Sequence, residues 1–198
     1  MQIPSLSLRP AVPTDAAFIA RHVLEALHFE MFAQPLSPDN QAIWDELTPV
    51  CAQEGTLYSY RHTTMAEVGG VPVGMLIAYD GAPYVEMRQR TFAQISAFRD
   101  ADFSVMDAET QAGEYYIDSV SVDPQWRAHG IGTALIRAAL AQASDLGLCP
   151  ALVVDPDNAP AQQLYARLGM MPCGTIHAFG QTFIRMRANK SGELSVES

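Results

Sequence analysis

Strands and helices alternate at short range in the second half of the chain, and this alternation restricts the fold more than any other feature. Residues 115–122 are rich in β-branched and aromatic side chains, which is typical of a strand. Residues 130–146 repeat apolar side chains at helical spacing, and Gly147 follows as a helix stop. Residues 151–154 form a second short strand, after which Asn158 is placed to cap another helix. This order requires a parallel or mixed sheet with covered faces.

The first half of the chain and its C-terminal end predict further strands and helices. Gly69-Gly70 separates two strand-like runs, and two consecutive glycines suit a two-residue hairpin turn that needs positive φ. Residues 80–113 are too long for a structureless loop, and their apolar spacing predicts a helical insert that either covers the sheet or walls a pocket. The other predicted segments are a strand at 6–10, a helix capped at Thr14-Asp15, a helix after Ser37, a closing hairpin of 175–178 and 182–187, and a frayed tail at 188–198.

The chain of 198 residues fits a single domain, residues 1–198, and its composition argues against several classes of protein. With 12 Lys+Arg against 22 Asp+Glu the formal net charge is −10, which disfavours nucleic acid as a partner. The acidity either keeps the protein soluble or favours a cationic substrate. We expect a cytoplasmic protein with no membrane partner, because no apolar run is long enough to span a bilayer and the first residues do not resemble a signal peptide. Three widely spaced cysteines predict neither a disulfide framework nor a metal site.

The loop between the predicted strand 115–122 and the next helix can bind an anion. Gly130 and Gly132 allow a ligand to approach the backbone closely. The first amides of a helix have no internal partner and lie at the positive end of the helix dipole, so a pyrophosphate fits there. No lysine follows Gly132 as in a Walker loop, and Leu135 stands where a dinucleotide fingerprint has its third glycine. Taken alone, the loop is either a pyrophosphate site or a tight turn.

Two motifs in the second half of the chain occur in the order and spacing of a known family. Arg127-x-x-Gly130-x-Gly132, followed by Asn158-x-x-Ala161-x-x-Leu164-Tyr165-x-x-x-Gly169, resembles the GNAT superfamily of acetyl-CoA-dependent N-acetyltransferases. The resemblance implies an α/β (α+β) fold, with a mixed, mostly antiparallel central sheet, a splayed parallel strand pair and helices on both faces. It also implies acetyl-CoA as co-substrate and no metal. The residues that it implies for cofactor binding are Val120, Ser121, Val122, Arg127, Ala128, His129, Gly130, Ile131, Gly132, Thr133, Asn158 and Ala161.

The resemblance also implies catalytic roles. Tyr165 would assist the departing thiolate of CoA, although helical spacing alone fits a core aromatic residue better. Val153 stands where some members carry a catalytic glutamate, so the general base lies elsewhere. Asp118 matches an acid of spermidine/spermine-type acetyltransferases, and burial in its apolar strand would raise its pKa; the alternative is a structural hydrogen-bond acceptor. Glu114 is the second candidate base, and water that relays protons to solvent is the third.

These observations predict an enzyme that transfers the acetyl group of acetyl-CoA to the primary amine of a small molecule, by direct attack of the amine on the thioester. The net charge of −10 favours a cationic or zwitterionic acceptor. One alternative is acetylation of peptide or protein N-termini or lysines, and another is a non-catalytic acyl-CoA-binding module of the same fold. A nucleotide enzyme is disfavoured by the missing lysine and third glycine. Many members of this family are dimers, so a homodimer is the assembly to test.

Overall fold

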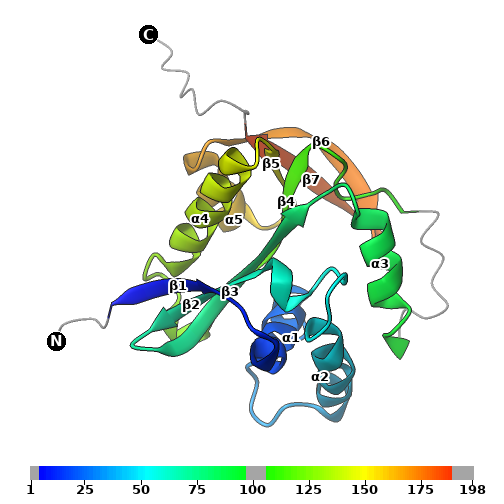
Figure 1. Ribbon diagram of the computed structural model, residues 1–198, viewed down its shortest axis with the longest axis vertical. Coiled ribbons are helices and arrows are strands. Elements are labelled where there is room, and N and C mark those ends of the chain that lie inside the picture. The colour runs from blue at the N-terminus through cyan, green and yellow to red at the C-terminus, as the bar shows by residue number, and fades with distance from the viewer. Residues whose placement is uncertain (1–4, 97–105, 189–198) are drawn as a thin grey trace. The chain divides into compact units, whose positions relative to one another are not determined.

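The computed structural model describes residues 5–96 and 106–188 (Figure 1). The chain divides into two compact units. The prediction of a single domain over residues 1–198 is not tested by this division and stays a prediction. Of the predicted tail, residues 189–198 lie outside the described residues. Unit 1 comprises Met1–Ala78, Val85–Ala101 and Ser119–Ile136, and unit 2 comprises Tyr79–Tyr84, Asp102–Asp118 and Arg137–Ser198, in each case as far as these residues are described.

Seven strands of the described chain form a mixed sheet in the order β1-β2-β3-β4-β5-β7-β6. The pairs β1–β2, β2–β3, β5–β7 and β6–β7 are antiparallel, and the pair β4–β5 is parallel. The predicted mixed, mostly antiparallel sheet is therefore confirmed. The strands are β1 (Leu6–Pro10), β2 (Thr63–Val68), β3 (Val71–Asp80), β4 (Glu114–Val122), β5 (Cys149–Val154), β6 (Met170–Ala178) and β7 (Gln181–Ala188).

The parallel pair β4–β5 is short, as expected of a splayed pair. Its register joins residues 114–116 to residues 149–151, and among the described residues it ends there, although β4 continues to Val122. Residues 151–154 of β5 pair with β7 on the other side. The far end of β4 is thus not held by a long parallel ladder.

Two helices of unit 1, α1 (Ala16–Ala26) and α2 (Pro38–Cys51), pack against each other (Figure 1). Helix α2 follows Ser37 as predicted, and Ser37 caps it, because its hydroxyl accepts a hydrogen bond from the amide of Asn40 at 3.1 Å. The predicted cap of α1 is wrong in its chemistry. The carboxylate of Asp15 accepts hydrogen bonds from Arg9 and from the amide of Val12, and a 3₁₀ turn, η1 (Pro13–Asp15), precedes the helix.

The hairpin β2–β3 turns at Gly69-Gly70, where φ is 60° and 79°, as the two glycines predicted. Further along β3, Gly74 allows a close approach to β4. A methyl group at this position would lie 2.9 Å from the carbonyl oxygen of Ser121, which is inside the contact distance. The packing of unit 1 around the end of β4 therefore depends on a glycine at position 74.

The predicted helix within residues 80–113 is confirmed as α3 (Tyr84–Phe92). Thr91 of α3 is fully buried, and its hydroxyl oxygen accepts a hydrogen bond from the amide of Leu57 at 2.8 Å. Residues 97–105 of the insert lie outside the described residues. Two further short 3₁₀ turns are η2 (Tyr60–His62) and η5 (Pro124–Trp126).

Two sequence signals set the ends of helices α4 (Ile131–Asp145) and α5 (Ala159–Arg167). Gly147 follows α4 with φ 66°, and its amide donates to the carbonyl of Ser144, which closes the helix as predicted. Asn158 caps α5, because its side-chain oxygen accepts from the amide of Ala161 at 3.2 Å.

The closing hairpin β6–β7 is longer than predicted. Its turn is Phe179-Gly180, and Gln181, expected in the turn, begins β7. Strand β6 begins at Met170 and not at Thr175. Pro172 and Gly174 both pair with β7, and the register shifts between them because Cys173 is left out of the pairing, as in a bulge.

Candidate active site

The loop between β4 and α4, in unit 1, has the backbone geometry of an anion site. After the η5 turn, Ala128 has φ 63° and Gly130 has φ 80°. Helix α4 begins at Ile131, and the amide of Ala134 donates to the carbonyl of Gly130 at 3.0 Å. The amides of residues 131–133 precede this first helical hydrogen bond, so they have no partner within the helix. These are the amides that the resemblance assigns to a pyrophosphate.

The same loop leaves room for a ligand. A methyl group built at Gly130 or at Gly132 would meet no atom within 4 Å, in contrast to Gly74. Ala128 and His129, on the same loop, are exposed. Donor groups at a helix N-terminus, next to open space, fit the phosphates of a CoA molecule.

Arg127 holds the loop to its own unit. Its Nε donates to the carbonyl of Val122 at 3.0 Å, and its Nη2 donates to Glu25 on α1, also at 3.0 Å. The second carboxylate oxygen of Glu25 accepts from the amide of Met31 at 2.9 Å. The sequence prediction placed Arg127 beside the pyrophosphate, and these contacts give its guanidinium a further role in fixing the end of β4. His129 contacts the carbonyl of Arg127 through Nδ1 at 2.8 Å.

The two faces of β4 differ in exposure. Asp118, Val120 and Val122 are partly exposed and share one face of the strand. Ser119 and Ser121 are buried on the other face. The Ser121 hydroxyl lies 2.8 Å from Nδ1 of His22, a buried residue of α1. Of the three cofactor residues predicted on this strand, Ser121 therefore has its side chain engaged inside unit 1.

Asp118 belongs to unit 2 and is held by a tyrosine. The hydroxyl of Tyr79 donates to its Oδ2 at 2.5 Å. Burial raises the pKa of Tyr79 well above its ordinary value, and the neighbouring Asp118 charge raises it further, so the phenol stays protonated and donates. Sequence reasoning missed Tyr79; the available signal was a hydroxyl near the end of a strand that is otherwise apolar.

A second carboxylate, Glu109, accepts hydrogen bonds from two tyrosines beside this pair. Tyr116 donates to Oε2 at 2.5 Å and Tyr84 donates to Oε1 at 2.8 Å. The ring of Tyr116 lies 5.8 Å from that of Tyr79. Burial, followed by the charge of Glu109, raises the pKa of Tyr116 well above its ordinary value. Three tyrosine hydroxyls of unit 2 therefore donate to two neighbouring carboxylates.

Glu114, the second candidate base, is surrounded by cations and donors. It is 1% exposed, and both of its carboxylate oxygens accept hydrogen bonds from Nη2 of Arg185. Nε of Arg187 lies 3.4 Å away, and the hydroxyl of Thr110 donates at 3.0 Å. Both carboxylate oxygens are occupied by ion pairs, so these contacts favour a structural role over a catalytic one.

The remaining predicted residues lie on α5 of unit 2. Asn158 and Ala161 are bonded to each other through the helix cap, so the cap occupies the Asn158 oxygen. Tyr165 is partly exposed, and burial raises the pKa of its hydroxyl above the ordinary value. The cofactor and catalytic roles of these residues stay predictions.

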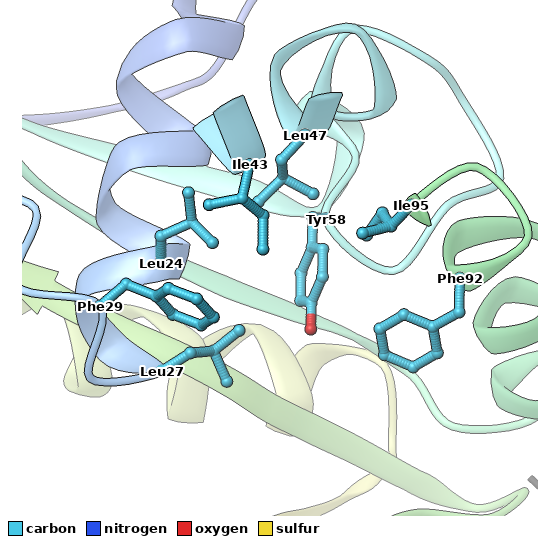
Figure 2. A pocket seen from close by; sticks show the side chains of 8 residues that line it. All are labelled: Leu24, Leu27, Phe29, Ile43, Leu47, Tyr58, Phe92 and Ile95. Carbon is cyan, nitrogen blue, oxygen red and sulfur yellow. The ribbon is translucent and has the colours of Figure 1, made fainter. Parts of the chain in front are cut away.

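Unit 1 also contains an apolar pocket of about 270 Å³ (Figure 2). It is lined by α1 and the following loop, by α2, by Tyr58 and by α3 and the residues after it. The Tyr58 hydroxyl is the one oxygen among the lining side chains, and it is directed to the side between Leu27 and Phe92 (Figure 2). The lining residues are Leu24, Leu27, Phe29, Ile43, Leu47, Tyr58, Phe92 and Ile95.

The comparisons with known proteins agree with this geometry. A model of the acetyltransferase (GNAT) family matches residues 24–170, which is most of the chain and includes both the loop and α5. This chain belongs to the GNAT family. The resemblance seen in the two motifs is thereby confirmed, and with it a family of acetyltransferases that use acetyl-CoA.

Individual GNAT relatives are similar to this chain at modest identity. A mycothiol acetyltransferase of Catenulispora acidiphila is 31% identical over 106 residues, which are 53% of this chain and 30% of that protein. The chain thus spans less than a third of the length of this curated relative. A solved acetyltransferase structure is 26% identical with a TM-score of 0.73, covering 93% of this chain and all of the other. The PaiA N-acetyltransferase of Thermoplasma acidophilum, solved with coenzyme A, is 13% identical with a TM-score of 0.57, covering 93% of this chain and 98% of the other.

Neither a metal-binding cluster nor a membrane-spanning helix is present among the described residues of this GNAT protein. Among residues 5–96 and 106–188, no group of three or more His, Cys, Asp or Glu side chains is placed to hold a metal ion. Over the same residues, no helix is both long and apolar enough to cross a bilayer.

Proposed function

We propose that this GNAT protein is an N-acetyltransferase that moves the acetyl group of acetyl-CoA to the primary amine of a small molecule. The loop of residues 127–133 carries this proposal, because it combines unpartnered helix amides with open space at Gly130 and Gly132. In this proposal the amides of Ala128 to Thr133 bind the pyrophosphate and the backbone of residues 120–122 binds the pantetheine arm. Asn158 and Ala161 contact the cofactor from α5, as the family motif implies.

Tyr165 stabilises the leaving group in this proposal. When bound, acetyl-CoA supplies an acetyl group on a thioester, whose parent thiol has a pKa of ~8.5 against ~10 for tyrosine. Burial raises the pKa of Tyr165 further, so its hydroxyl stays protonated and donates a hydrogen bond to the sulfur instead of losing its proton. The backbone N–H of Val122 donates to the carbonyl oxygen, where negative charge develops.

Asp118 is the better candidate for the general base. An alkyl ammonium with a pKa of ~10.4 must lose a proton before it attacks. Asp118 is partly exposed and is held by a neutral phenol, whereas Glu114 is buried between two arginines. A carboxylate with contact to solvent exchanges protons more readily than one that is enclosed in ion pairs. If the Asp118→Asn variant keeps the pH profile of the wild type, water relays the proton to solvent instead.

The acceptor in this proposal carries an apolar group next to its amine. Leu24 lines the apolar pocket, and its neighbour in the chain, Glu25, pairs with Arg127 of the cofactor loop. The pocket is lined by apolar side chains, so it suits a small apolar group. A small volume favours a free amine over a polypeptide, and the net charge of −10 favours a cation. A cytoplasmic location and a homodimer complete the proposal.

Ligand-induced stabilisation tests the cofactor. Acetyl-CoA at ~100 times its dissociation constant should stabilise the fold by about 2.7 kcal/mol, seen as a rise in melting temperature, and NAD should not. Gly130→Val should abolish that rise, because a branched side chain at φ 80° both distorts the loop and fills its open space. Gly147→Val is the matched control, since it places the same strain at φ 66° at the other end of α4. Loss of the response in both variants, or a response to NAD alone, contradicts the proposal.

Release of free thiol from acetyl-CoA tests the chemistry and the acceptor. Tyr165→Phe should lower turnover by about 10²-fold or more at an unchanged acetyl-CoA response. Across a series of primary amines, longer apolar groups should raise kcat/KM. Leu27→Trp should remove that dependence by filling the pocket, and Leu146→Trp, at an exposed leucine outside it, should not. Preference for neutral arylamines, or rates that do not change with ionic strength, contradict a cationic acceptor.

A further inference from the structure

One buried imidazole of unit 1 contacts both residues that flank Val122. Nδ1 of His22 lies 2.8 Å from the hydroxyl of Ser121, and Nε2 lies 3.2 Å from Oδ1 of Asp123. The His22 ring is fully buried on α1, stacked on Phe18 with centroids 4.1 Å apart. The approach of Nε2 to Asp123 is close but not aligned as a regular hydrogen bond, which leaves Nε2 poorly satisfied.

The chemistry of the two partners selects one form of the ring. Burial lowers the pKa of His22, and the nearby Asp123 only partly opposes this, so the imidazole is neutral at neutral pH. A carboxylate can only accept, so the proton of the neutral ring belongs on Nε2, facing Asp123. Nδ1 is then the acceptor for the hydroxyl proton of Ser121. Each ring nitrogen therefore holds one side chain of the strand end.

These contacts fix the backbone on both sides of Val122. Ser121 and Asp123 are two residues apart and contact the same ring. The carbonyl of Val122 accepts from Arg127, the amide of Asp123 donates to the carbonyl of Val73 at 2.9 Å, and Gly74 allows the close packing beneath. With both neighbours held, the peptide groups of Val122 cannot rotate freely. The direction of its N–H is set from α1.

We propose that His22 is a positioning residue for acetyl transfer, which holds Ser121 and Asp123 so that the Val122 amide is aimed at the thioester carbonyl. This inference rests on the proposed function. His22 does not act on the reactants itself, because it is fully buried and Ser121 is 7% exposed. Its effect passes through the backbone of β4.

Two substitutions separate the hydrogen bonds of His22 from its packing. His22→Phe keeps an aromatic ring against Phe18 but removes both polar contacts. His22→Gln keeps a donor and an acceptor. Val23→Ala is the packing control, because Val23 is the next residue on α1 and is fully buried. Ser121→Ala removes one contact from the strand side and alters the core little.

Steady-state kinetics should split kcat from KM. We expect His22→Phe to lower kcat at least tenfold with less than a threefold change in KM for acetyl-CoA, since the loop of residues 127–133 still binds the cofactor. His22→Gln should recover kcat to within threefold, Val23→Ala should keep it, and Ser121→Ala should lower it three- to tenfold. Unchanged kcat in both His22→Phe and Ser121→Ala, or an equal loss in His22→Gln and Val23→Ala, overturns the proposal.

Amide hydrogen exchange supplies a readout without turnover. In the ligand-free protein, His22→Phe should accelerate exchange in a peptide spanning residues 119–124 at least tenfold more than Val23→Ala does. If the wild-type protein does not release thiol from acetyl-CoA with any amine, the proposed function fails, whatever the exchange rates are. If it does, and His22→Phe exchanges like Val23→Ala in that peptide, the positioning role fails alone.

Discussion

The two ends of strand β4 hold their acidic residues in opposite ways. At its start, in unit 2, the carboxylate of Glu114 is fully buried and is neutralised by Arg185 and Arg187. Just after its end, in unit 1, the carboxylate of Asp123 lies beside a neutral imidazole and keeps some exposure to solvent. Between them, Asp118 is bonded by a phenol. At the start of the strand, the carboxylate is compensated by opposite charges.

The two arrangements suit different roles, one that holds the fold together and one that takes part in a reaction. A buried ion pair is costly to break, because the partner that remains is an uncompensated charge, so it suits a position that never changes its protonation state. Asp118, by contrast, accepts a hydrogen bond from the phenol of Tyr79 and is partly exposed. Along β4, it is the position to which the proposed function assigns proton transfer.

The largest expected effect on stability comes from removing the ion pairs of Glu114 at the start of β4. Glu114→Ala leaves the partly buried Arg185 without its counter-charge and should lower the free energy of unfolding by about 3–5 kcal/mol, measured by urea denaturation. Glu54→Ala breaks the ion pair with Arg61, whose two side chains are mostly exposed, and should leave the unfolding curve unchanged within error. Equal curves for the two variants would show that the arginines do not depend on Glu114.

The next effect concerns Asp118. Asp118→Asn should lower turnover by about 10²-fold, the usual contribution of a positioned base. Tyr79→Phe should also lower turnover, but by less, because it removes the phenol that holds the Asp118 carboxylate and leaves the carboxylate itself. Tyr84→Phe is the control, since its hydroxyl donates to Glu109. A pH profile of kcat/KM that is unchanged in Asp118→Asn removes Asp118 from the role of base.

A third effect tests how tightly the end of β4 is packed. Gly74→Ala places a methyl group 2.9 Å from the Ser121 carbonyl oxygen and should lower the free energy of unfolding by about 1–3 kcal/mol. Gly132→Ala adds the same methyl group to a helix with no atom within 4 Å, and should raise stability by up to about 1 kcal/mol. The sign of the difference between the two variants, read from thermal unfolding, is the result that matters.

The smallest effect is a pH dependence of stability. His22 has a lowered pKa in the folded protein, from burial first, with Arg21 lowering it further and Asp123 and Glu25 opposing. The unfolded chain therefore binds the extra proton more readily. The contribution of His22 is complete above pH ~6.5 and is lost as the pH falls toward the folded pKa, by at most about 1.4 kcal/mol per pH unit. The difference between the unfolding free energies of wild type and His22→Gln, measured between pH 5 and pH 7.5, should show this slope; a flat difference contradicts it.

Local signals in the sequence predicted most of the fold. Ser37, Gly147 and Asn158 set helix ends through contacts within a few residues, and the Gly69-Gly70 turn set a hairpin. The misplaced elements have physical causes. Asp15 was expected to cap its own helix, but it is taken by the guanidinium of Arg9. Strand β6 was predicted too short because a bulge, which a pattern does not show, carries the strand past its proline and glycine.

The candidate site was predictable where it depends on a motif and not where it depends on tertiary contacts. The loop of residues 127–133 was read from its glycines. The contact of His22 with Ser121 joins residues 99 positions apart, and that of Glu114 with Arg185 joins residues 71 positions apart. No periodicity reports such pairs, so the same sequence reasoning ranked Glu114 as a base and gave His22 no role.

The separation of Glu114 from its arginines also has a consequence for synthesis. A ribosome releases residue 114 well before it has made Arg185 and Arg187 on the last strand, β7. Until that strand has emerged, burial of Glu114 would leave a charge without its partners. We therefore expect unit 2 not to fold around Glu114 early. Nascent chains that end before residue 185 should therefore keep Glu114 in water and gain protection from protease only when the final hairpin has been released.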